Sequence, residues 1–116
     1  MGSVKGAKAK GRNLQNLLRD KLRVAFPSLE EDDVKSQTMG MSGEDIVLSP
    51  AARREIPYSF ECKNVERLQF WSAVEQCETN CKEGITPVIV VKKNRKTPMA
   101  ALPLDVFIKL IKERNC

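Results

Sequence analysis

An acidic and a basic residue, separated by one position, follow a short apolar run in the middle of the chain. Glu61 and Lys63 are two positions apart, so on a β-strand they point to one face, while Phe60 and Cys62 point to the other. Asp45 lies upstream, directly before a second apolar run. Two carboxylates and an ammonium group in one place can hold a hard cation such as Mg²⁺ and support phosphodiester hydrolysis.

The lack of histidine narrows the chemistry further. None of the 116 residues is a histidine, which excludes Ser-His-Asp and Cys-His catalysis, nucleases with a histidine base and His-ligated metals. The four cysteines do not have the spacing of a zinc knuckle or of a usual disulfide, so we expect reduced thiols. Carboxylates, lysine and a hard cation remain as the means of hydrolysis.

The composition is that of one globular domain with a polyanionic partner. The chain is 41% hydrophobic and 30% charged, and its net charge of +5 is compatible with binding to nucleic acid. It has no apolar run of transmembrane length and no hydrophobic segment of a signal peptide. We therefore expect a soluble, cytoplasmic protein without membrane contacts.

The elements that must position the acidic and basic residues follow from apolar periodicity and from proline and glycine. Residues 1–11 are rich in Gly, Ala and Lys and predict a flexible basic arm, and residues 12–116 predict a single domain. Within that domain the pattern predicts helices over 13–26, 66–82 and from Pro103 onward, and strands over 34–39, 46–48, 56–63, 86–91 and 98–102.

This order of elements predicts an α/β fold with a mixed central β-sheet flanked by helices. Strands 56–63 and 86–91 are joined by a helix, so we expect them to be parallel, with a right-handed crossover. Strands 46–48 and 56–63 are joined by a short polar turn, which predicts an antiparallel pair. Apolar spacing places Trp71 in the core and predicts an inner face of the last helix, formed by Leu104, Phe107, Ile108 and Ile111.

The chain resembles the PD-(D/E)xK nuclease superfamily, the restriction-endonuclease-like group that includes type II restriction enzymes, Holliday-junction resolvases and phage-borne or homing endonucleases. The family core is αβββαβ, with an acidic residue opening the second strand, here Glu44-Asp45, and the (D/E)xK motif on the third, here Glu61-Cys62-Lys63. The resemblance covers residues 13–91. It implies a Mg²⁺- or Mn²⁺-dependent endonuclease acting on double-stranded or branched DNA, a homodimer, and location in the host cytoplasm if the protein is phage-encoded.

The resemblance and the residue chemistry together suggest roles for individual side chains. Asp45 and Glu61 are the expected metal ligands, with the Cys62 carbonyl as a third, and Lys63 positions water or stabilises developing charge. Glu44 directly precedes Asp45, at the position where the family motif has proline. Gln15 occupies the place of a glutamate that many members carry on the first helix, and Gln76 and Gln69 fit the polar position on the helix after the motif.

Two further classes of function stay open at this stage: a catalytically inactive nucleic-acid-binding domain on the same fold, with which the uncharged Gln15 is compatible, and a small α/β protein without a nucleic-acid role. In the second, Glu61 and Lys63 are an ordinary same-face pair on a solvated strand. An aromatic content of 5% argues against a platform that stacks single-stranded bases. The candidate phosphate contacts are the basic residues of the N-terminal segment and of the turn after strand 86–91: Lys5, Lys8, Lys10, Arg12, Lys92, Lys93, Arg95 and Lys96.

Overall fold

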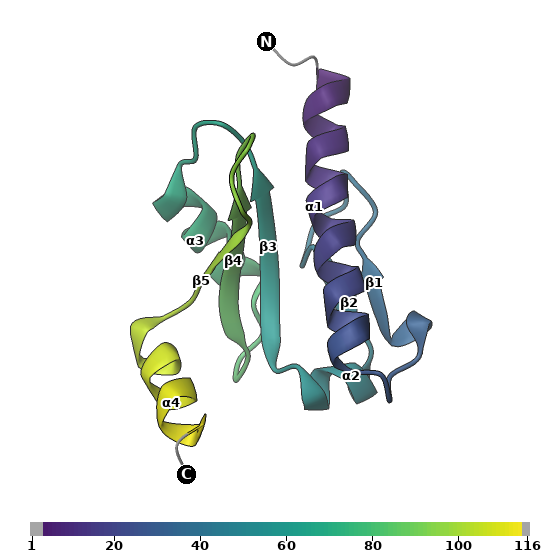
Figure 1. Ribbon diagram of the computed structural model, residues 1–116, viewed down its shortest axis with the longest axis vertical. Coiled ribbons are helices and arrows are strands. Elements are labelled where there is room, and N and C mark those ends of the chain that lie inside the picture. Colours follow the sequence, from purple (N-terminus) through teal and green to yellow (C-terminus); the bar gives the residue numbers. More distant parts are fainter. Residues whose placement is uncertain (1–3, 115–116) are drawn as a thin grey trace.

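The computed structural model describes the backbone of residues 4–114 and the side chains of residues 6–114. Its elements confirm the α/β class. Along the chain they are α1 (Val4–Ala25), a 3₁₀ turn η1 (Glu31–Asp33), β1 (Val34–Ser36), β2 (Ile46–Leu48), α2 (Pro50–Glu55), β3 (Tyr58–Asn64), α3 (Phe70–Asn80), β4 (Thr86–Lys92), β5 (Met99–Ala101) and α4 (Leu104–Arg114) (Figure 1).

The strands form two small sheets. β1 pairs antiparallel with β2, and the second sheet has the order β3-β4-β5, with β3 parallel to β4 and β5 antiparallel to β4. The predicted parallel pair is therefore confirmed. The predicted mixed central sheet is confirmed only in part, because β3-β4-β5 is mixed whereas β1 and β2 form a separate antiparallel sheet. The Asp45 N–H donates to the Phe60 carbonyl at 3.0 Å, and this bond links the start of β2 to β3.

The predicted antiparallel pairing of β2 with β3 is also wrong, because residues 50–55 form helix α2 instead of a tight turn. Pro50 is well suited to the first helical turn, where its missing N–H is not needed. The Ser49 hydroxyl caps the helix by accepting from the Ala52 N–H at 3.1 Å. The helix redirects the chain, so β3 pairs with β4.

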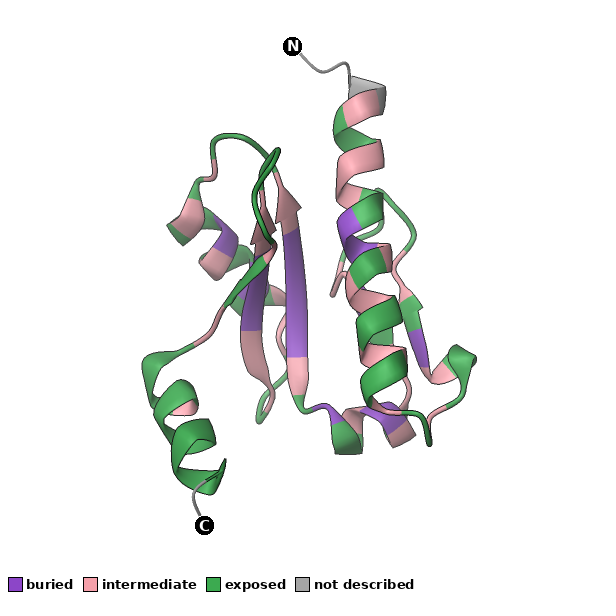
Figure 2. Ribbon diagram, in the orientation of Figure 1, coloured by how far each residue is buried: buried purple, intermediate pink, exposed green. Residues whose placement is uncertain are grey.

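The β3-β4-β5 sheet has a helix on each face (Figure 2). On one face α1 closes the main core, which consists of Leu14, Val34, Ile46, Ala52, Ile56, Phe60, Cys62, Val88 and Val90. On the other face α3 packs Ala73 and Cys77 against Ile89. Because both faces are covered, Ser59 to Cys62 of β3 are all buried, and the face that carries Glu61 and Lys63 is the one that α3 covers.

Helix α1 starts at Val4, so the flexible arm predicted over residues 1–11 is wrong for residues 4–11; residues 1–3 lie outside the described part. Alanine and lysine, which fill much of this segment, are strong helix formers. The end of β3 also contacts it, since the Asn64 side chain donates to the Lys10 carbonyl at 3.0 Å. Lys10 also lies 3.7 Å from the Glu66 carboxylate. These contacts hold the basic segment beside β3.

Two apolar expectations are wrong. Trp71 is 74% exposed, because Ala73 and Cys77 define the inner face of α3 and Trp71 lies about 200° around the helix from Ala73. The apolar side of α4 is likewise exposed, although its spacing predicts burial: Leu104, Phe107, Ile108 and Ile111. Figure 1 shows α4 at the end of the molecule, next to the sheet rather than over it.

Across residues 4–114, no helix has both the length and the apolar character needed to cross a membrane.

Candidate active site

Strand β3 places Glu61 and Lys63 side by side. Their charged atoms, Glu61 Oε1 and Lys63 Nζ, are 3.7 Å apart. Glu61 is only 4% exposed, whereas Lys63 is half-buried at the edge of the site. This is not the solvated surface pair that the sequence left open, because a buried carboxylate needs compensating partners.

Asp45 meets β3 through two hydrogen bonds. Its backbone N–H donates to Phe60, and its Oδ2 accepts from the Cys62 N–H at 2.6 Å. These bonds place the carboxyl of Asp45 next to that of Glu61, with which it forms a side-chain hydrogen bond. Residues 17 positions apart are thus brought together at one point of the strand.

The environment disfavours two negative charges at this point. Burial raises the pKa of Glu61 to about 7, and the neighbouring Asp45 charge adds to that effect, while Lys63 opposes it. Burial also raises the pKa of Asp45, against the opposing influence of the Cys62 N–H, Lys63 and Gln15. The pair therefore tends to retain a proton unless another positive charge is supplied.

Gln15 reaches this pair from α1. It lies on the buried side of the helix beside Leu14, is 5% exposed, and its side chain hydrogen bonds with Asp45. Among the described residues its Oε1 atom is buried and has no hydrogen-bond partner. An uncompensated buried acceptor is costly, so this oxygen is suited to a cation or a polar ligand held at Asp45.

Helix α3 forms the wall opposite the acidic pair. Gln76 lines two adjoining hollows, one of about 330 Å³ that includes Asp45 and one of about 220 Å³ that includes Lys63. Gln69, at the start of α3, lines the hollow that contains Lys63. The structure thus brings the predicted polar wall next to the predicted acidic and basic residues.

Glu44 has a different place from Asp45. Its carboxylate forms an ion pair with Arg53 of α2, and Arg53 also donates to the Tyr58 carbonyl at 2.6 Å. This arrangement ties the loop before β2 to the start of β3. Sequence reasoning did not identify Arg53 as a partner, because its distance along the chain from Glu44 gives no signal of contact.

The two basic segments come together at one end of the sheet. Glu66 lies 3.7 Å from the Lys10 ammonium and accepts from the Asn94 N–H at 2.6 Å, so it links α1 to the turn between β4 and β5. Sequence reasoning missed this role of Glu66. The predicted phosphate contacts Lys8, Arg12, Lys93, Arg95 and Lys96 are exposed, Lys10 and Lys92 are half-buried, and the Lys5 side chain lies outside the described residues.

The donor set is compatible with a hard cation that keeps part of its water shell. Between residues 4 and 114, no three or more His, Cys, Asp or Glu side chains are arranged to hold a metal. The available oxygens are the Asp45 and Glu61 carboxylates, the Cys62 carbonyl and the Gln15 amide oxygen. Mg²⁺ commonly binds one or two carboxylates and retains several waters, so this set fits it.

Comparison with protein-family models, with curated proteins and with solved structures finds no match for this chain.

Proposed function

We propose that this protein is a Mg²⁺- or Mn²⁺-dependent endonuclease that hydrolyses phosphodiester bonds in double-stranded or branched DNA. One observation supports this most: Asp45, Glu61 and Lys63 converge at a buried point of β3 that opens into hollows beside α3. A restriction-endonuclease-like core of the PD-(D/E)xK type, resolvase-like or of a phage or homing enzyme, is part of the proposal.

In this proposal Asp45 and Glu61 hold the cation, with the Cys62 carbonyl and the Gln15 amide oxygen beside them. When bound, the cation neutralises charge at the scissile phosphate and increases the acidity of a water molecule. The Cys62 N–H fixes the orientation of the Asp45 carboxylate, so this side chain loses little conformational freedom on binding. The raised pKa values of both acids are relieved by the same positive charge.

Lys63 and Gln76 act on the phosphate and the water. The Lys63 ammonium, 3.7 Å from Glu61, can orient the attacking water or stabilise a phosphate oxygen as negative charge develops. Gln76 lies between the two hollows and offers an amide donor on the opposite side. The Lys63 ammonium forms an ion pair with the Glu61 carboxylate, so we assign Lys63 the role of a donor rather than of a general base.

The DNA would lie along the basic end of the sheet. Glu66 contacts Lys10 of α1 and the turn at residues 92–96, so the two basic segments lie at the same end of the sheet. Such contacts bind phosphates without reading sequence. A homodimer would bring two of these sites to the two strands of DNA, and the exposed apolar side of α4 is a surface suited to a second copy.

The test is a cleavage assay with supercoiled, linear and four-way-junction DNA in Mg²⁺ or Mn²⁺. Wild-type protein is expected to cut at least one of these substrates, and Asp45→Asn, Glu61→Gln and Lys63→Ala are expected to slow cleavage at least about 100-fold without loss of folding. Cleavage by all three variants at the wild-type rate would overturn the assignment of these residues to the active site.

The second candidate is a catalytically inactive DNA-binding domain. It is favoured by the presence of only two carboxylates at the site within the described residues and by the uncharged Gln15. Salt-sensitive DNA binding without cleavage in either metal would support this candidate over the enzyme.

A further inference from the structure

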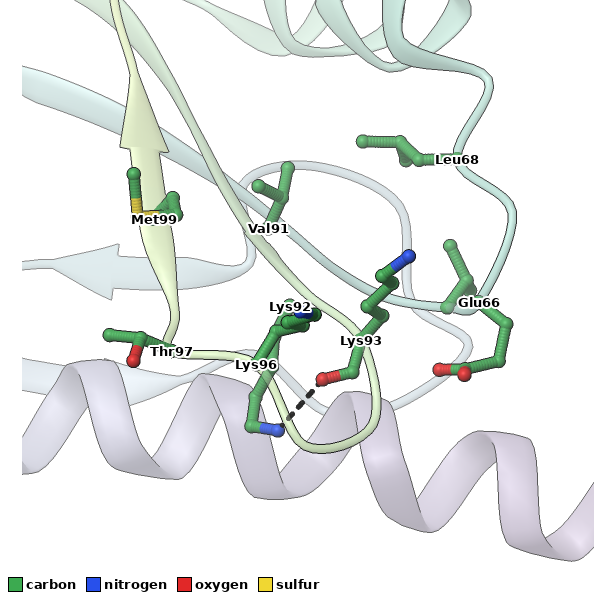
Figure 3. A pocket seen from close by; sticks show the side chains of 9 residues that line it. Glu66, Leu68, Val91, Lys92, Lys93, Lys96, Thr97 and Met99 are labelled. Atoms are coloured by element: carbon green, nitrogen blue, oxygen red, sulfur yellow. Dashed lines mark hydrogen bonds between the residues drawn. The ribbon is translucent and has the colours of Figure 1, made fainter.

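A hollow of about 600 Å³ lies beside the candidate active site (Figure 3). Its floor is apolar and comes from three elements: Leu68 of the loop before α3, Val91 of β4 and Met99 of β5. Three lysines also line it: Lys92 at the end of β4, and Lys93 and Lys96 in the turn between β4 and β5. We call it the lysine-rimmed hollow.

The hollow continues directly from the active site. Val65 and Leu68 line both this hollow and the smaller one that contains Lys63. In the sheet, Lys63 is the partner of Val91, and Val91 is the partner of Met99. These three residues therefore form one row on one face, and two strand spacings put Met99 about 10 Å from Lys63.

The charge at the rim is positive. Glu66 is the acidic residue of the lining, and its carboxylate is engaged by the Asn94 N–H at 2.6 Å and by Lys10 at 3.7 Å. Lys92 Nζ donates to the Lys93 carbonyl at 3.1 Å, which holds that ammonium at the turn. Figure 3 shows the Lys93 side chain extending from the turn toward Leu68 and Glu66, at the rim of the hollow.

We propose that the lysine-rimmed hollow holds one unpaired nucleotide of a branched DNA substrate, next to the phosphate that is cleaved. The apolar floor contacts the face of the base and the lysines bind its phosphate. A base in a duplex presents its edges and keeps its faces stacked, so only an unstacked nucleotide can use such a floor. The volume falls within the range of small-ligand pockets.

This inference rests on the proposed nuclease function and specifies its substrate class. It predicts that strand separation at a branch, rather than base sequence, is what the protein recognises beside the cleavage point. The Leu68, Val91 and Met99 side chains carry no hydrogen-bond donors that would distinguish one base from another.

The test compares forked DNA with an otherwise identical fork in which the first unpaired nucleotide of either arm is abasic. Affinity is measured by fluorescence anisotropy in Ca²⁺, for wild type, Met99→Gln and the matched control Val24→Gln. Met99 and Val24 are 64% and 81% exposed, and Val24 is outside the hollow, so both variants should fold, which thermal denaturation checks. Blunt duplex and free deoxynucleoside monophosphate serve as further ligands.

Wild type and Val24→Gln are expected to lose about tenfold in affinity on removal of the base in one arm, because the apolar floor then buries no base face, and Met99→Gln is expected to show about twofold or less. Blunt duplex should bind wild type and Met99→Gln equally. An equal abasic penalty in wild type and Met99→Gln, or no penalty at all, would overturn the proposal. Millimolar free deoxynucleoside monophosphate should compete with the fork more strongly on wild type than on Met99→Gln, and equal competition on both proteins would overturn the proposal.

The outcome is separable from that of the proposed function. DNA cleavage without an abasic penalty would support the proposed endonuclease activity and refute nucleotide binding in the lysine-rimmed hollow. An abasic penalty that Met99→Gln removes, in a protein that cuts nothing, would support the hollow and refute the enzyme.

Discussion

In the absence of a divalent cation, the free energy of unfolding should fall as pH rises, because Glu61 is buried beside Asp45. Glu61 ionises near its ordinary value of 4.5 in the unfolded chain but near 7 in the folded one. Its contribution to stability is therefore fully present below pH 4.5 and is lost as pH rises through about 7.

The size of the effect follows from the pKa difference. A rise from 4.5 to about 7 corresponds to about 3 kcal/mol in the free energy of unfolding, since one pKa unit is worth about 1.4 kcal/mol. Glu61→Gln keeps the size of the side chain and removes the charge. In EDTA at pH 8 this variant should be more stable than wild type by up to about 3 kcal/mol, and near pH 4 the two should differ by less than about 1 kcal/mol.

Urea denaturation followed by far-UV circular dichroism measures this difference. Glu75→Gln, the same substitution at an exposed position of α3, is the matched control and should follow wild type at every pH. Subtracting the wild-type curve removes the contributions of titrating groups away from the Asp45–Glu61 pair, including Asp33 and Glu66, whose lowered pKa values act in the opposite direction. A Glu61→Gln variant no more stable than wild type at pH 8 would refute the burial argument.

Magnesium should reverse the loss at pH 8, because the cation compensates the two carboxylates. The expected gain for wild type and Glu75→Gln is about 2.7 kcal/mol at a Mg²⁺ concentration 100 times the Kd. Glu61→Gln and Asp45→Asn should gain much less. Equal gains in all four proteins would mean that Mg²⁺ binds elsewhere.

Three further perturbations follow from the contacts. Arg53→Ala should destabilise the protein by about 2 kcal/mol in urea denaturation, because it leaves the Glu44 carboxylate without its cation, whereas Arg54→Ala, at an exposed neighbour, should change little; equal losses would contradict this role. Lys93→Ala should weaken binding to all DNA sequences alike and reduce the slope of log affinity against log salt by about 1, and an unchanged slope would remove Lys93 from the phosphate contacts. Ile108→Glu should convert a dimer into a monomer in multi-angle light scattering, while a wild-type monomer would refute a dimer through α4.

Local sequence pattern predicted the parts of the fold that depend on neighbouring residues. Alternation along β3 correctly placed Glu61 and Lys63 on one face and Phe60 and Cys62 on the other. The helix between β3 and β4 correctly predicted their parallel pairing. Asp45 was predicted next to these residues because it opens a strand, and its bond to the Cys62 N–H places it there.

Features that depend on distant contacts could not be predicted in the same way. Apolar spacing in α4 predicts an apolar side but does not say whether the same chain covers it, and that side is exposed. The polar composition of residues 1–11 predicted a flexible segment. Lys10 nevertheless belongs to α1, and its contacts with Asn64 and Glu66 hold this part of the helix beside β3. Trp71 was misplaced because the small side chain of Ala73, rather than the large apolar side chain of Trp71, lies inward with Cys77.

The most direct test of the central claim is the single-turnover rate of DNA cleavage by Glu61→Gln and by Glu75→Gln in Mg²⁺, each compared with wild type. Each substitution replaces a carboxyl group by an amide, and only the first replaces the carboxyl group that lies beside Asp45 and Lys63. We predict that Glu75→Gln cuts at the wild-type rate, that Glu61→Gln cuts at least about 100-fold more slowly, and that EDTA stops all cleavage. Cleavage by Glu61→Gln at the wild-type rate, or cleavage that persists in EDTA, would contradict the assignment of this site.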